Sequence, residues 1–501
     1  MKRQADLMRK AAGKDACPTG VSLPIGFSRK VEQASLPAVF VLVFAFLLAG
    51  CTAGPNYKRP DVPVPPAFRS PTPSPTDTAS LADLPWFEVF KDDQLQALIR
   101  AALQNNYDLR DAVAHVDAAR AVAGITRSSQ LPNFGASGAV NINRLSRDAT
   151  TMLPPQILPN QDRNFGSAGL NLLSFELDLW GKLRRATEAA RAELLNAEEN
   201  RKTVATVLVS DVATAYFSLR ELDNELAISQ DTLKTRQDSL GLTKTRQEGG
   251  VATLLDLRQA EQLVDTAAQA IPVLQQRIEQ TENRISLLVA KNPDTVARGR
   301  ALTEQVLPEV PPGLPSALLE RRPDIRASEQ ELIAANARIG VAKAAYFPDI
   351  SLTGFLGGQS TQLSSLFAGP HSAWSFVPQV SQPIFTAGRL KQNVKLAEAQ
   401  RDSALIHYEK AIQTAFTEVS DALIAHQRVR ESREKQEELV TALQDRKRLA
   451  YIRYRGGVDT ELNALDADRD LFQAQLTLSS IRLDEVLTVV QLYQALGGGW
   501  K

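Results

Sequence analysis

Residues 246–255 read Arg-Gln-Glu-Gly-Gly-Val-Ala-Thr-Leu-Leu, and residues 453–462 read Arg-Tyr-Arg-Gly-Gly-Val-Asp-Thr-Glu-Leu. Each copy lies between two long stretches with helical periodicity, so we expect each to be the turn at the end of a helical hairpin. Paired glycines end a helix at low steric cost, and the threonine two residues after the valine is a candidate cap for the next helix. The copies lie 453 − 246 = 207 residues apart, which indicates a chain built from two similar halves.

A second match supports the duplication. Residues 108–133 align with residues 324–349 without a gap at an offset of 324 − 108 = 216, and both segments end at a proline motif. Chance seldom produces such a match over this length. We therefore predict a first repeat over residues 81–291, a crossover over 292–322 that packs around the middle of the molecule, and a second repeat over 323–501.

Each repeat contains one predicted β-hairpin, over residues 132–180 in the first and 348–386 in the second. Apolar and polar residues alternate from Leu173 to Leu179 and from Ile350 to Gly354, which is typical of strands with one apolar face. Four strands are too few to close a barrel, and open sheet edges are not tolerated in lipid, so several chains would have to pool their strands. Three chains would give twelve strands, within the range of outer-membrane barrels. The alternative is a small soluble sheet that caps a helical bundle.

Long helices are predicted around these hairpins. From Lys182 to Gln247 the apolar and alanine positions recur at a spacing between the 3.5 residues of a coiled coil and the 3.6 of a straight helix. Such a helix reaches ~100 Å, far beyond the ~30 Å core of a bilayer. The helix after the first turn contains Pro272 where the second half has Ser479, so we expect a kink in the first half alone. Leu95 to Gln130 is expected to form one helix.

The N-terminus carries a predicted secretion signal over residues 1–50. A basic leader precedes an apolar run from Leu36 to Ala49 that is too short to span a bilayer permanently. The run ends in Leu-Ala-Gly-Cys51, which resembles a bacterial lipoprotein box, where the new N-terminal cysteine receives lipid; Thr52 after it favours the outer membrane. Residues 51–80 are rich in proline and should form an extended arm. The alternative is an ordinary signal peptide with an incidental cysteine.

Composition argues against several classes of protein. Lys plus Arg and Asp plus Glu both number 57, so no overall charge favours a nucleic-acid partner. The four histidines form no pair at metal-ligand spacing, and signal cleavage would leave Cys51 as the one cysteine, which excludes an intrachain disulfide. The chain has no Walker A loop, no Gly-x-Ser-x-Gly elbow and no His-Glu-x-x-His motif. We therefore expect no enzyme, no metal and no cofactor other than covalent lipid on Cys51.

An acidic cluster follows the second turn. Asp459, Leu462, Asp466 and Asp470 are spaced by three or four residues and so share one helix face. If several copies met at an axis, these carboxylates would form a ring at a constriction, which favours cations. The same spacing is also found on ordinary exposed acidic faces.

Together these features resemble the TolC-like outer membrane factors, and among them the lipidated NodT-type efflux proteins. The resemblance rests on the lipoprotein box with the Gly-Pro-Asn-Tyr of residues 54–57, the segment over 319–348, the turn over 454–458 and the tail over 492–500. It covers essentially all of the mature chain. Such proteins are trimers in which a twelve-stranded outer-membrane β-barrel continues into a periplasmic α-barrel. They are the exit duct for an inner-membrane pump, usually a proton-driven RND transporter, which is joined through a periplasmic adaptor.

The resemblance implies that the two turns, over residues 248–253 and 455–460, are periplasmic tips. The residues implied to meet the adaptor are Gly249, Gly250, Val251 and Thr253, with Gly456, Gly457, Val458 and Thr460. It also implies that Leu462 and Asp466 narrow the closed channel as an apolar and an acidic ring. The first half has Leu255 and Gln259 at those positions, so an acidic ring would come from the second half alone.

Two other classes remain open, a periplasmic coiled-coil adaptor and a structural envelope lipoprotein. An adaptor would have one hairpin flanked by the halves of a small β-domain, and a structural lipoprotein would lack alternating strands. We expect a mainly α protein with a β membrane part, which forms a homotrimer anchored by lipid to the outer membrane and has a large periplasmic part.

Overall fold

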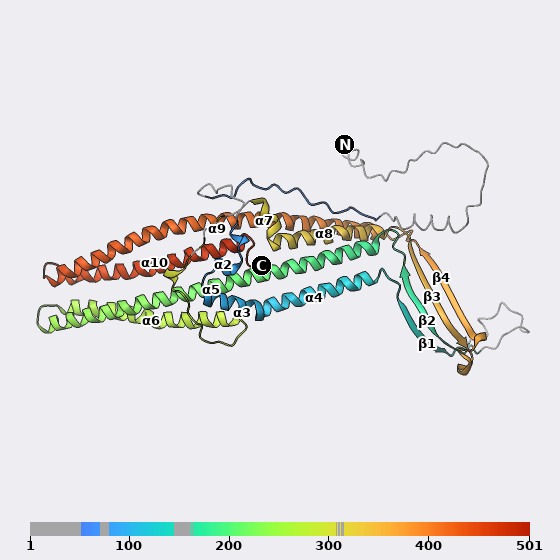
Figure 1. Cartoon of the computed structure of the whole chain (residues 1–501), viewed down its shortest axis with the longest axis horizontal. Coiled ribbons are helices and arrows are strands. Elements are labelled where there is room, and N and C mark those ends of the chain that lie inside the picture. The colour runs from blue at the N-terminus through green and yellow to red at the C-terminus, as the bar shows by residue number, and fades with distance from the viewer. Residues whose placement is uncertain are drawn as a thin grey trace, which may run out of the picture. The chain divides into compact units, whose positions relative to one another are not determined.

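The computed structural model describes residues 52–70, 80–144, 162, 164–306, 308, 311 and 315–500. The predicted signal peptide, Cys51 and the polar loop over residues 150–161 lie outside these ranges. From Thr52 on, the chain forms a bundle of long helices joined at one end to a four-stranded sheet (Figure 1). The two Gly-Gly turns lie at the opposite end of the bundle (Figure 1).

Three helices of the first half have counterparts of the same length and order in the second half. The pairs are α4 (Tyr107–Ser128) and α8 (Pro323–Ala344) with 22 residues, α5 (Lys182–Glu248) and α9 (Arg389–Arg455) with 67, and α6 (Leu254–Leu288) and α10 (Glu461–Ala495) with 35. Equal lengths in the same order agree with an internal duplication, and α5 covers the long helix expected from Lys182 to Gln247. Pro272 lies inside α6. Within the described ranges, no helix is both long enough and apolar enough to cross a membrane.

The prediction of a single helix from Leu95 to Gln130 is wrong. The segment forms α3 (Asp93–Asn105) and then α4, separated by Asn106, whose φ of −53° and ψ of 135° are not helical. The Asn106 side chain accepts a hydrogen bond from the backbone N–H of Leu109 (3.0 Å), and its amide donates to the carbonyl of Leu288 (3.0 Å). Asn106 therefore caps α4 and ties this break to the end of α6.

The sheet joins the two halves. Its strands are β1 (Phe134–Asn141), β2 (Phe165–Glu176), β3 (Asp349–Ser360) and β4 (Ser372–Ser381). All neighbours are antiparallel in the order β1-β2-β3-β4, so each half contributes one hairpin and β2 pairs with β3 across the halves. Two short 3-10 helices, η5 (Leu363–Ser365) and η6 (Gly369–His371), lie between β3 and β4. Pro378 lies in β4 opposite Leu352 of β3.

An irregularity in β2 changes which side chains face each side of the sheet. Leu172 pairs with Gly354 before the irregularity, and Phe175 pairs with Leu352 after it. Because Gly354 and Leu352 lie two residues apart on β3, Leu172 and Phe175 share a face although one number is even and the other odd. The predicted alternation that begins at Leu173 therefore holds only after this irregularity.

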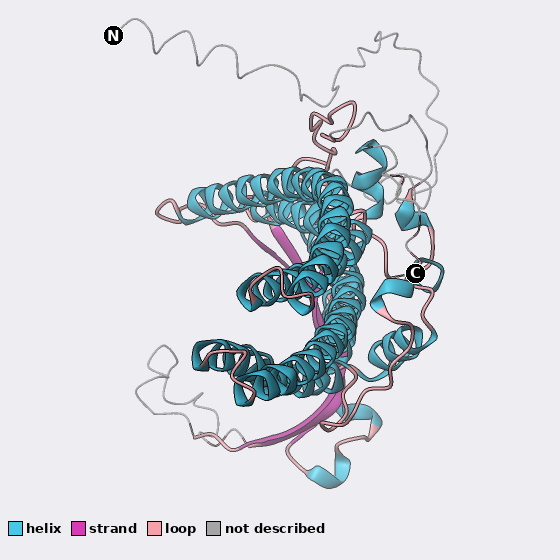
Figure 2. Cartoon of the chain, turned by 90° about the vertical axis from the view of Figure 1, so that its left-hand side faces the viewer, coloured by secondary structure: helices cyan, strands magenta, loops and turns pink. Residues whose placement is uncertain are grey.

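The main hydrophobic core lies at the middle of the molecule, where short segments pack on the long helices. These include η1 (Leu81–Asp83), α2 (Trp86–Val89) and α3, and the core encloses the fully buried rings of Tyr216, Tyr408 and Tyr493. Seen from the Gly-Gly turns, the long helices and the sheet follow one curve, with short helices on its outer side (Figure 2).

Asp92 holds the crossover against the main hydrophobic core. In the crossover lie η4 (Leu302–Glu304) and α7 (Pro315–Arg321). The buried Asp92 carboxylate accepts hydrogen bonds from two N–H groups at the start of α3, from the Tyr216 hydroxyl (3.0 Å), from the backbone of Arg300 (2.9 Å) and from the side chain of Gln305 (3.0 Å). One carboxylate therefore joins α3, α5 and the crossover.

Candidate functional site

Both Gly-Gly turns have the same backbone geometry. Gly250 and Gly457 have φ angles of +73° and +75°, which favour glycine. The N–H of Val251 donates to the carbonyl five residues before it (2.8 Å), and Val458 does the same (3.1 Å), a bond that closes helices ending in a left-handed residue. The predicted tip residues lie in or directly beside these turns: Gly249, Gly250, Val251 and Thr253 in the first, and Gly456, Gly457, Val458 and Thr460 in the second.

The two predicted threonine caps differ. The Thr253 hydroxyl accepts from the N–H of Asp256 (3.2 Å), and the Asp256 carboxylate accepts from the N–H of Thr253 (2.7 Å), so this pair forms a capping box. Thr460 occupies the cap position of α10, but its side chain makes no capping bond, so the prediction is wrong there. The residue three positions on is Asn463, whose side-chain amide donates to Asp459 (2.6 Å).

Apolar side chains are exposed at both tips. Val251 is 70% exposed and Val458 68%, and Leu254 and Leu255 beside the first turn are also exposed.

The predicted gate residues lie one helical turn apart on α10. Leu462 is 49% exposed, and the Asp466 carboxylate lies 3.2 Å from the Arg469 guanidinium. One turn further, Asp470 pairs with Arg446 (2.7 Å) and with Arg469 (3.2 Å). The hydrogen bond from Arg446 holds the pKa of Asp470 below its usual value, so this carboxyl stays ionised at neutral pH. This face of α10 therefore carries acids that are paired with arginines of the same chain.

A buried ion pair joins the first helical hairpin to the second. Arg236 of α5 donates from Nε to Asp468 of α10 (2.8 Å), and the two side chains are 3% and 2% exposed. Lys447 of α9 lies 2.5 Å from the other oxygen of Asp468. Arg236 also donates to the carbonyl of Leu263 (2.9 Å) in α6. This cluster, which we did not predict from the sequence, ties all four long helices together.

A second buried contact lies nearer the turns. Glu461, at the start of α10, accepts hydrogen bonds from the Thr243 hydroxyl of α5 and from the Tyr454 hydroxyl of α9 (3.0 Å). The Arg246 guanidinium lies over the Tyr454 ring, 4.7 Å from its centre, where a cation is attracted to an aromatic face. The second tip is therefore held against α5 by polar contacts.

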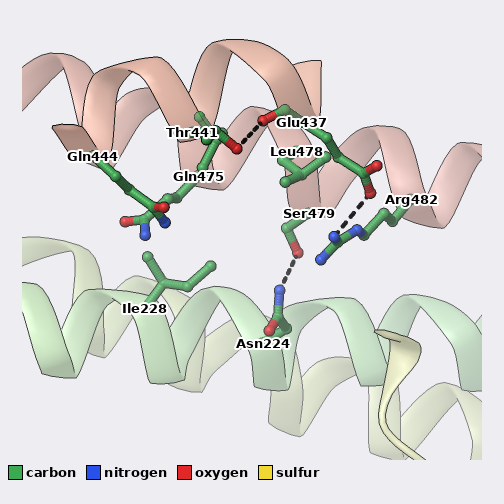
Figure 3. A pocket seen from close by; sticks show the side chains of 10 residues that line it. Asn224, Ile228, Glu437, Thr441, Gln444, Gln475, Leu478, Ser479 and Arg482 are labelled. Atoms are coloured by element: carbon green, nitrogen blue, oxygen red, sulfur yellow. Dashed lines mark hydrogen bonds and ion pairs between the residues drawn. The ribbon is translucent and has the colours of Figure 1, made fainter. Parts of the chain in front are cut away.

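A polar cavity of about 520 Å³ lies between α5, α9 and α10 (Figure 3). Across it, Asn224 of α5 donates to the Ser479 hydroxyl of α10 (2.8 Å), and Arg482 donates to Glu437 (3.0 Å). Ser479 is the counterpart of Pro272, which has no hydroxyl, so the Asn224 contact cannot be repeated in the first half.

Two glutamates lie on α5 beside this cavity. Glu221 is buried, and Glu225 lies one helical turn further, 3.6 Å from Arg277 of α6. Burial, and then the neighbouring Glu225 carboxylate, raise the pKa of Glu221 to about 8, while Arg277 and Ser479 oppose the shift. Glu221 therefore keeps its proton at neutral pH.

We expect the melting temperature to fall between about pH 4.5 and 8 because of Glu221. In this window the unfolded chain has lost the proton and the folded chain still holds it, so the free energy of unfolding decreases as pH rises. The glutamine of the Glu221→Gln variant cannot ionise. The variant should therefore keep the free energy of unfolding that the wild type loses over this pH range, on the order of a few kcal/mol. Melting of the detergent-solubilised protein at pH 5 and pH 8.5 measures it. The control is Glu434→Gln, at an exposed glutamate. If the melting temperature of Glu221→Gln fell between the two pH values as much as that of the wild type, the assignment would be contradicted.

The proline-rich arm lies against the junction between helices and sheet. The N–H of Ala53 donates to the carbonyl of Trp180 (2.9 Å), and the buried Arg185 guanidinium donates to the Asn56 side chain (2.6 Å). These contacts hold the residues that follow Cys51 at the level where the sheet begins.

One face of the sheet is apolar across all four strands. Its exposed side chains, each between 58% and 78% accessible, are Val140, Leu170, Leu356, Trp374, Phe376 and Val380. The opposite face is mostly polar or small, with Asn141, Asn171, Ser351 and Gln379, although Phe355 and the exposed Val377 also lie on it. Sheets with one apolar and one polar face are typical of barrels whose outside contacts lipid.

Comparisons with known proteins match most of the chain to outer membrane proteins of efflux systems. The family model described as "Outer membrane efflux protein" matches residues 98–291 and 314–498. The toluene efflux pump outer membrane protein TtgC of Pseudomonas putida is 40% identical over 462 residues, which are 91% of this chain and 94% of that protein. OprJ of Pseudomonas aeruginosa is 36% identical over 92% of this chain and 96% of that protein.

Solved channels have the same fold. The outer-membrane channel OprN superposes with a TM-score of 0.83 at 30% identity, over 90% of this chain and 100% of that one. The open-state MtrE channel of Neisseria gonorrhoeae superposes with a TM-score of 0.79 at 32% identity, over 90% and 99%.

These matches agree with the mainly helical fold and its few antiparallel strands. In the part of the chain that the structure describes, no group of three or more His, Cys, Asp or Glu side chains could hold a metal ion. The matching family consists of transport channels rather than enzymes. The chain belongs to the outer membrane efflux protein family and is an efflux channel of the outer membrane with a large periplasmic helical part.

Proposed function

We propose that three copies of this chain form the exit duct of a tripartite efflux system, with a twelve-stranded barrel in the outer membrane continued by a periplasmic α-barrel. The observation that carries this proposal is the two-faced sheet, whose edge strands β1 and β4 have no partner within the described chain. Unpaired backbone groups have no hydrogen-bond partner in lipid, so the edges have to meet those of other copies. Three copies supply twelve strands, a number that outer-membrane barrels use.

The proposed partners are a periplasmic adaptor and an inner-membrane pump of the RND class. The exposed Val251 and Val458 support contact between the tips and a helical hairpin of the adaptor. Relatives are named for pumps that export toluene and antibiotics, so small toxic compounds are the proposed substrates. An adaptor or a purely structural lipoprotein is disfavoured, because the relatives that match nearly the whole chain are channel proteins.

A complementation experiment tests the duct. Cells that lack their own outer-membrane efflux channel should export a fluorescent pump substrate again when they express this chain with its adaptor and pump. Export restored by the adaptor and pump without this chain would contradict the proposal.

Lipid on Cys51 is the proposed anchor. The lipoprotein box supports it, and so do the contacts that hold Ala53 and Asn56 at the junction of helices and sheet. Radiolabelled palmitate should enter the wild-type protein and not the Cys51→Ser variant. Equal labelling of both proteins would contradict it.

Leu462 and Asp466 are the proposed constriction of the closed channel. The exposure of Leu462 and its position one turn from Asp466 support this role. We expect the double variant Leu462→Ala with Asp466→Ala to leak, because it removes both the apolar and the charged barrier. Single-channel conductance and vancomycin uptake measure the leak, and the matched control is Leu255→Ala with Gln259→Ala at the first tip. Unchanged conductance and uptake in the Leu462 and Asp466 variant would contradict the assignment.

A further inference from the structure

We infer that the segment between β3 and β4, residues 361–371, lies on the outer leaflet of the outer membrane and places Phe367 and Leu363 among its acyl chains. This stretch is called the β3–β4 segment below. The inference rests on the proposed barrel and adds to it a lipid contact at the outer rim.

The β3–β4 segment lies at the end of the sheet that is farthest from the long helices (Figure 1). Strand β3 begins at Asp349, soon after α8, and its 12 residues end at Ser360. A strand of this length, tilted as in outer-membrane barrels, rises about 30 Å, close to the ~25 Å height of their apolar band. Because the helical part is periplasmic, the segment is at the outer margin of the membrane.

The β3–β4 segment folds back over the apolar face of the sheet. The face that carries Leu356 also carries Gly358 and, across the pairing with β2, Gly166. A Cβ atom added to Gly166 would lie 2.8 Å from the Leu363 side chain. One added to Gly358 would clash with the carbonyl oxygen of Leu366. The segment therefore covers the face of the sheet that meets lipid in the proposed barrel, and not the face that meets the channel.

Polar groups of the segment bond to one another. The N–H of Gln362 donates to the Ser360 hydroxyl (3.1 Å), which lies 2.8 Å from the Ser365 hydroxyl. The N–H groups of Ala368 and His371 donate to carbonyls three residues before them (3.0 and 2.9 Å). Acyl chains offer no hydrogen bonds, so backbone groups beside lipid need partners within the protein. These bonds allow the segment to lie against lipid.

Two apolar side chains of the segment are exposed, Phe367 by 81% and Leu363 by 67%. They continue an apolar surface that begins on the sheet with Trp374 (78%) and its strand neighbour Leu356 (65%). Exposed apolar surface of this kind marks a contact with a membrane or a protein, and aromatic side chains gather at membrane surfaces. Its continuity with the lipid-facing side of the sheet favours the membrane.

The sequence around the segment is uncharged. From Ile350 to Gly388 the chain has no Asp, Glu, Lys or Arg. The connection between β1 and β2, over residues 142–164, differs because it contains five charged residues: Arg144, Arg147, Asp148, Asp162 and Arg163. Charged side chains are costly in lipid. Of the two connections at this end of the sheet, the neutral one has the chemistry of a segment that enters acyl chains.

Fluorescence quenching tests this contact. The thiol of a Phe367→Cys variant is labelled with the dye NBD, and the protein is reconstituted in phosphatidylcholine vesicles that contain lipid with a nitroxide high on its acyl chain. Because Phe367 is exposed, its replacement should leave the fold intact. A Leu363→Cys variant is labelled in the same way, and the chain without an engineered cysteine gives the labelling background.

Two positions on β3 are the matched controls. Gln359→Cys is exposed on the opposite face of the sheet at the level of the segment. Leu356→Cys lies on the apolar face and reports whether the sheet is in lipid. Nitroxide lipid should lower the emission several-fold more at Phe367 than at Gln359. Iodide, present on both sides of the bilayer, should quench the dye at Gln359 more than the dye at Phe367.

Each other result overturns the inference. If nitroxide lipid quenched the dye at Leu356 while iodide quenched the dye at Phe367, the segment would lie in water and the barrel would stand. A dye at Phe367 that is shielded from both quenchers would show a contact with protein instead of lipid. If nitroxide lipid did not quench the dye at Leu356, the proposed barrel would be overturned together with the inference.

Discussion

Asp468→Ala is expected to lower the free energy of unfolding by about 3–5 kcal/mol and to make the closed channel leak. The change leaves the Arg236 guanidinium buried without its counter-ion and takes from Lys447 a carboxylate at 2.5 Å. Because Asp468 on α10 holds α5 and α9, its loss should free the second tip from the first hairpin. Chemical denaturation in detergent measures stability, and single-channel conductance measures the leak.

Asp470→Ala is the matched control for this variant. Asp470 lies on the same helix but is partly exposed and pairs at the surface with Arg446, so its removal should cost about 0–1 kcal/mol. If Asp468→Ala had the same free energy of unfolding and the same closed-channel conductance as Asp470→Ala, the buried cluster would not hold the tips.

Asp92→Ala is expected to have the second largest effect, a loss of about 3–5 kcal/mol in the free energy of unfolding, because it leaves several buried donors without an acceptor. The Asp92 carboxylate is 1% exposed. Burial disfavours its charge, but hydrogen bonds from Gln305, the backbone of Leu95 and the backbone of Arg300 outweigh burial and hold its pKa below the usual value. The stabilisation it provides is therefore present at neutral pH and is lost as pH falls through this lowered pKa. Thermal melting at pH 7 measures the loss.

Asp93→Ala is the control for Asp92→Ala, since Asp93 is the exposed first residue of α3. We expect faster hydrogen exchange in the crossover and at the start of α3 in the Asp92 variant and little change in the control. Equal exchange in both variants would show that Asp92 does not join these segments.

The sequence predicted those features that depend on neighbouring residues or on a repeated residue pattern. Gly250 and Gly457 end their helices because glycine adopts a positive φ at low cost. The length of α5 followed from an apolar spacing sustained over many turns. The strand pairs followed from alternation, although the irregularity after Leu172 moved part of β2 out of the expected phase.

The buried ties between the hairpins depend on distant partners. Arg236 and Asp468 are 232 residues apart, and Thr243 and Glu461 are 218 apart, so no local spacing connects them. The sequence holds one local indication that Asp468 is buried: it lies four residues after Ala464, on the same helix face, and Ala464 is buried. An acid on a buried face requires a partner, but the sequence does not tell which helix provides it.

The break at Asn106 shows a related limit. The apolar pattern continues across Asn106, and the break depends on a side chain that bonds both to the next turn and to the distant carbonyl of Leu288. Thr460 shows a different limit, because its residue type favours a helix cap and yet its side chain makes no capping bond.

We propose that three copies join through the free edges of their sheets and so close one β-barrel. Native mass spectrometry of protein extracted from the outer membrane in mild detergent tests it most directly. We predict one species with the mass of three mature chains, each carrying the lipid expected on Cys51. A species with the mass of a single chain under conditions that keep the fold intact would contradict the account.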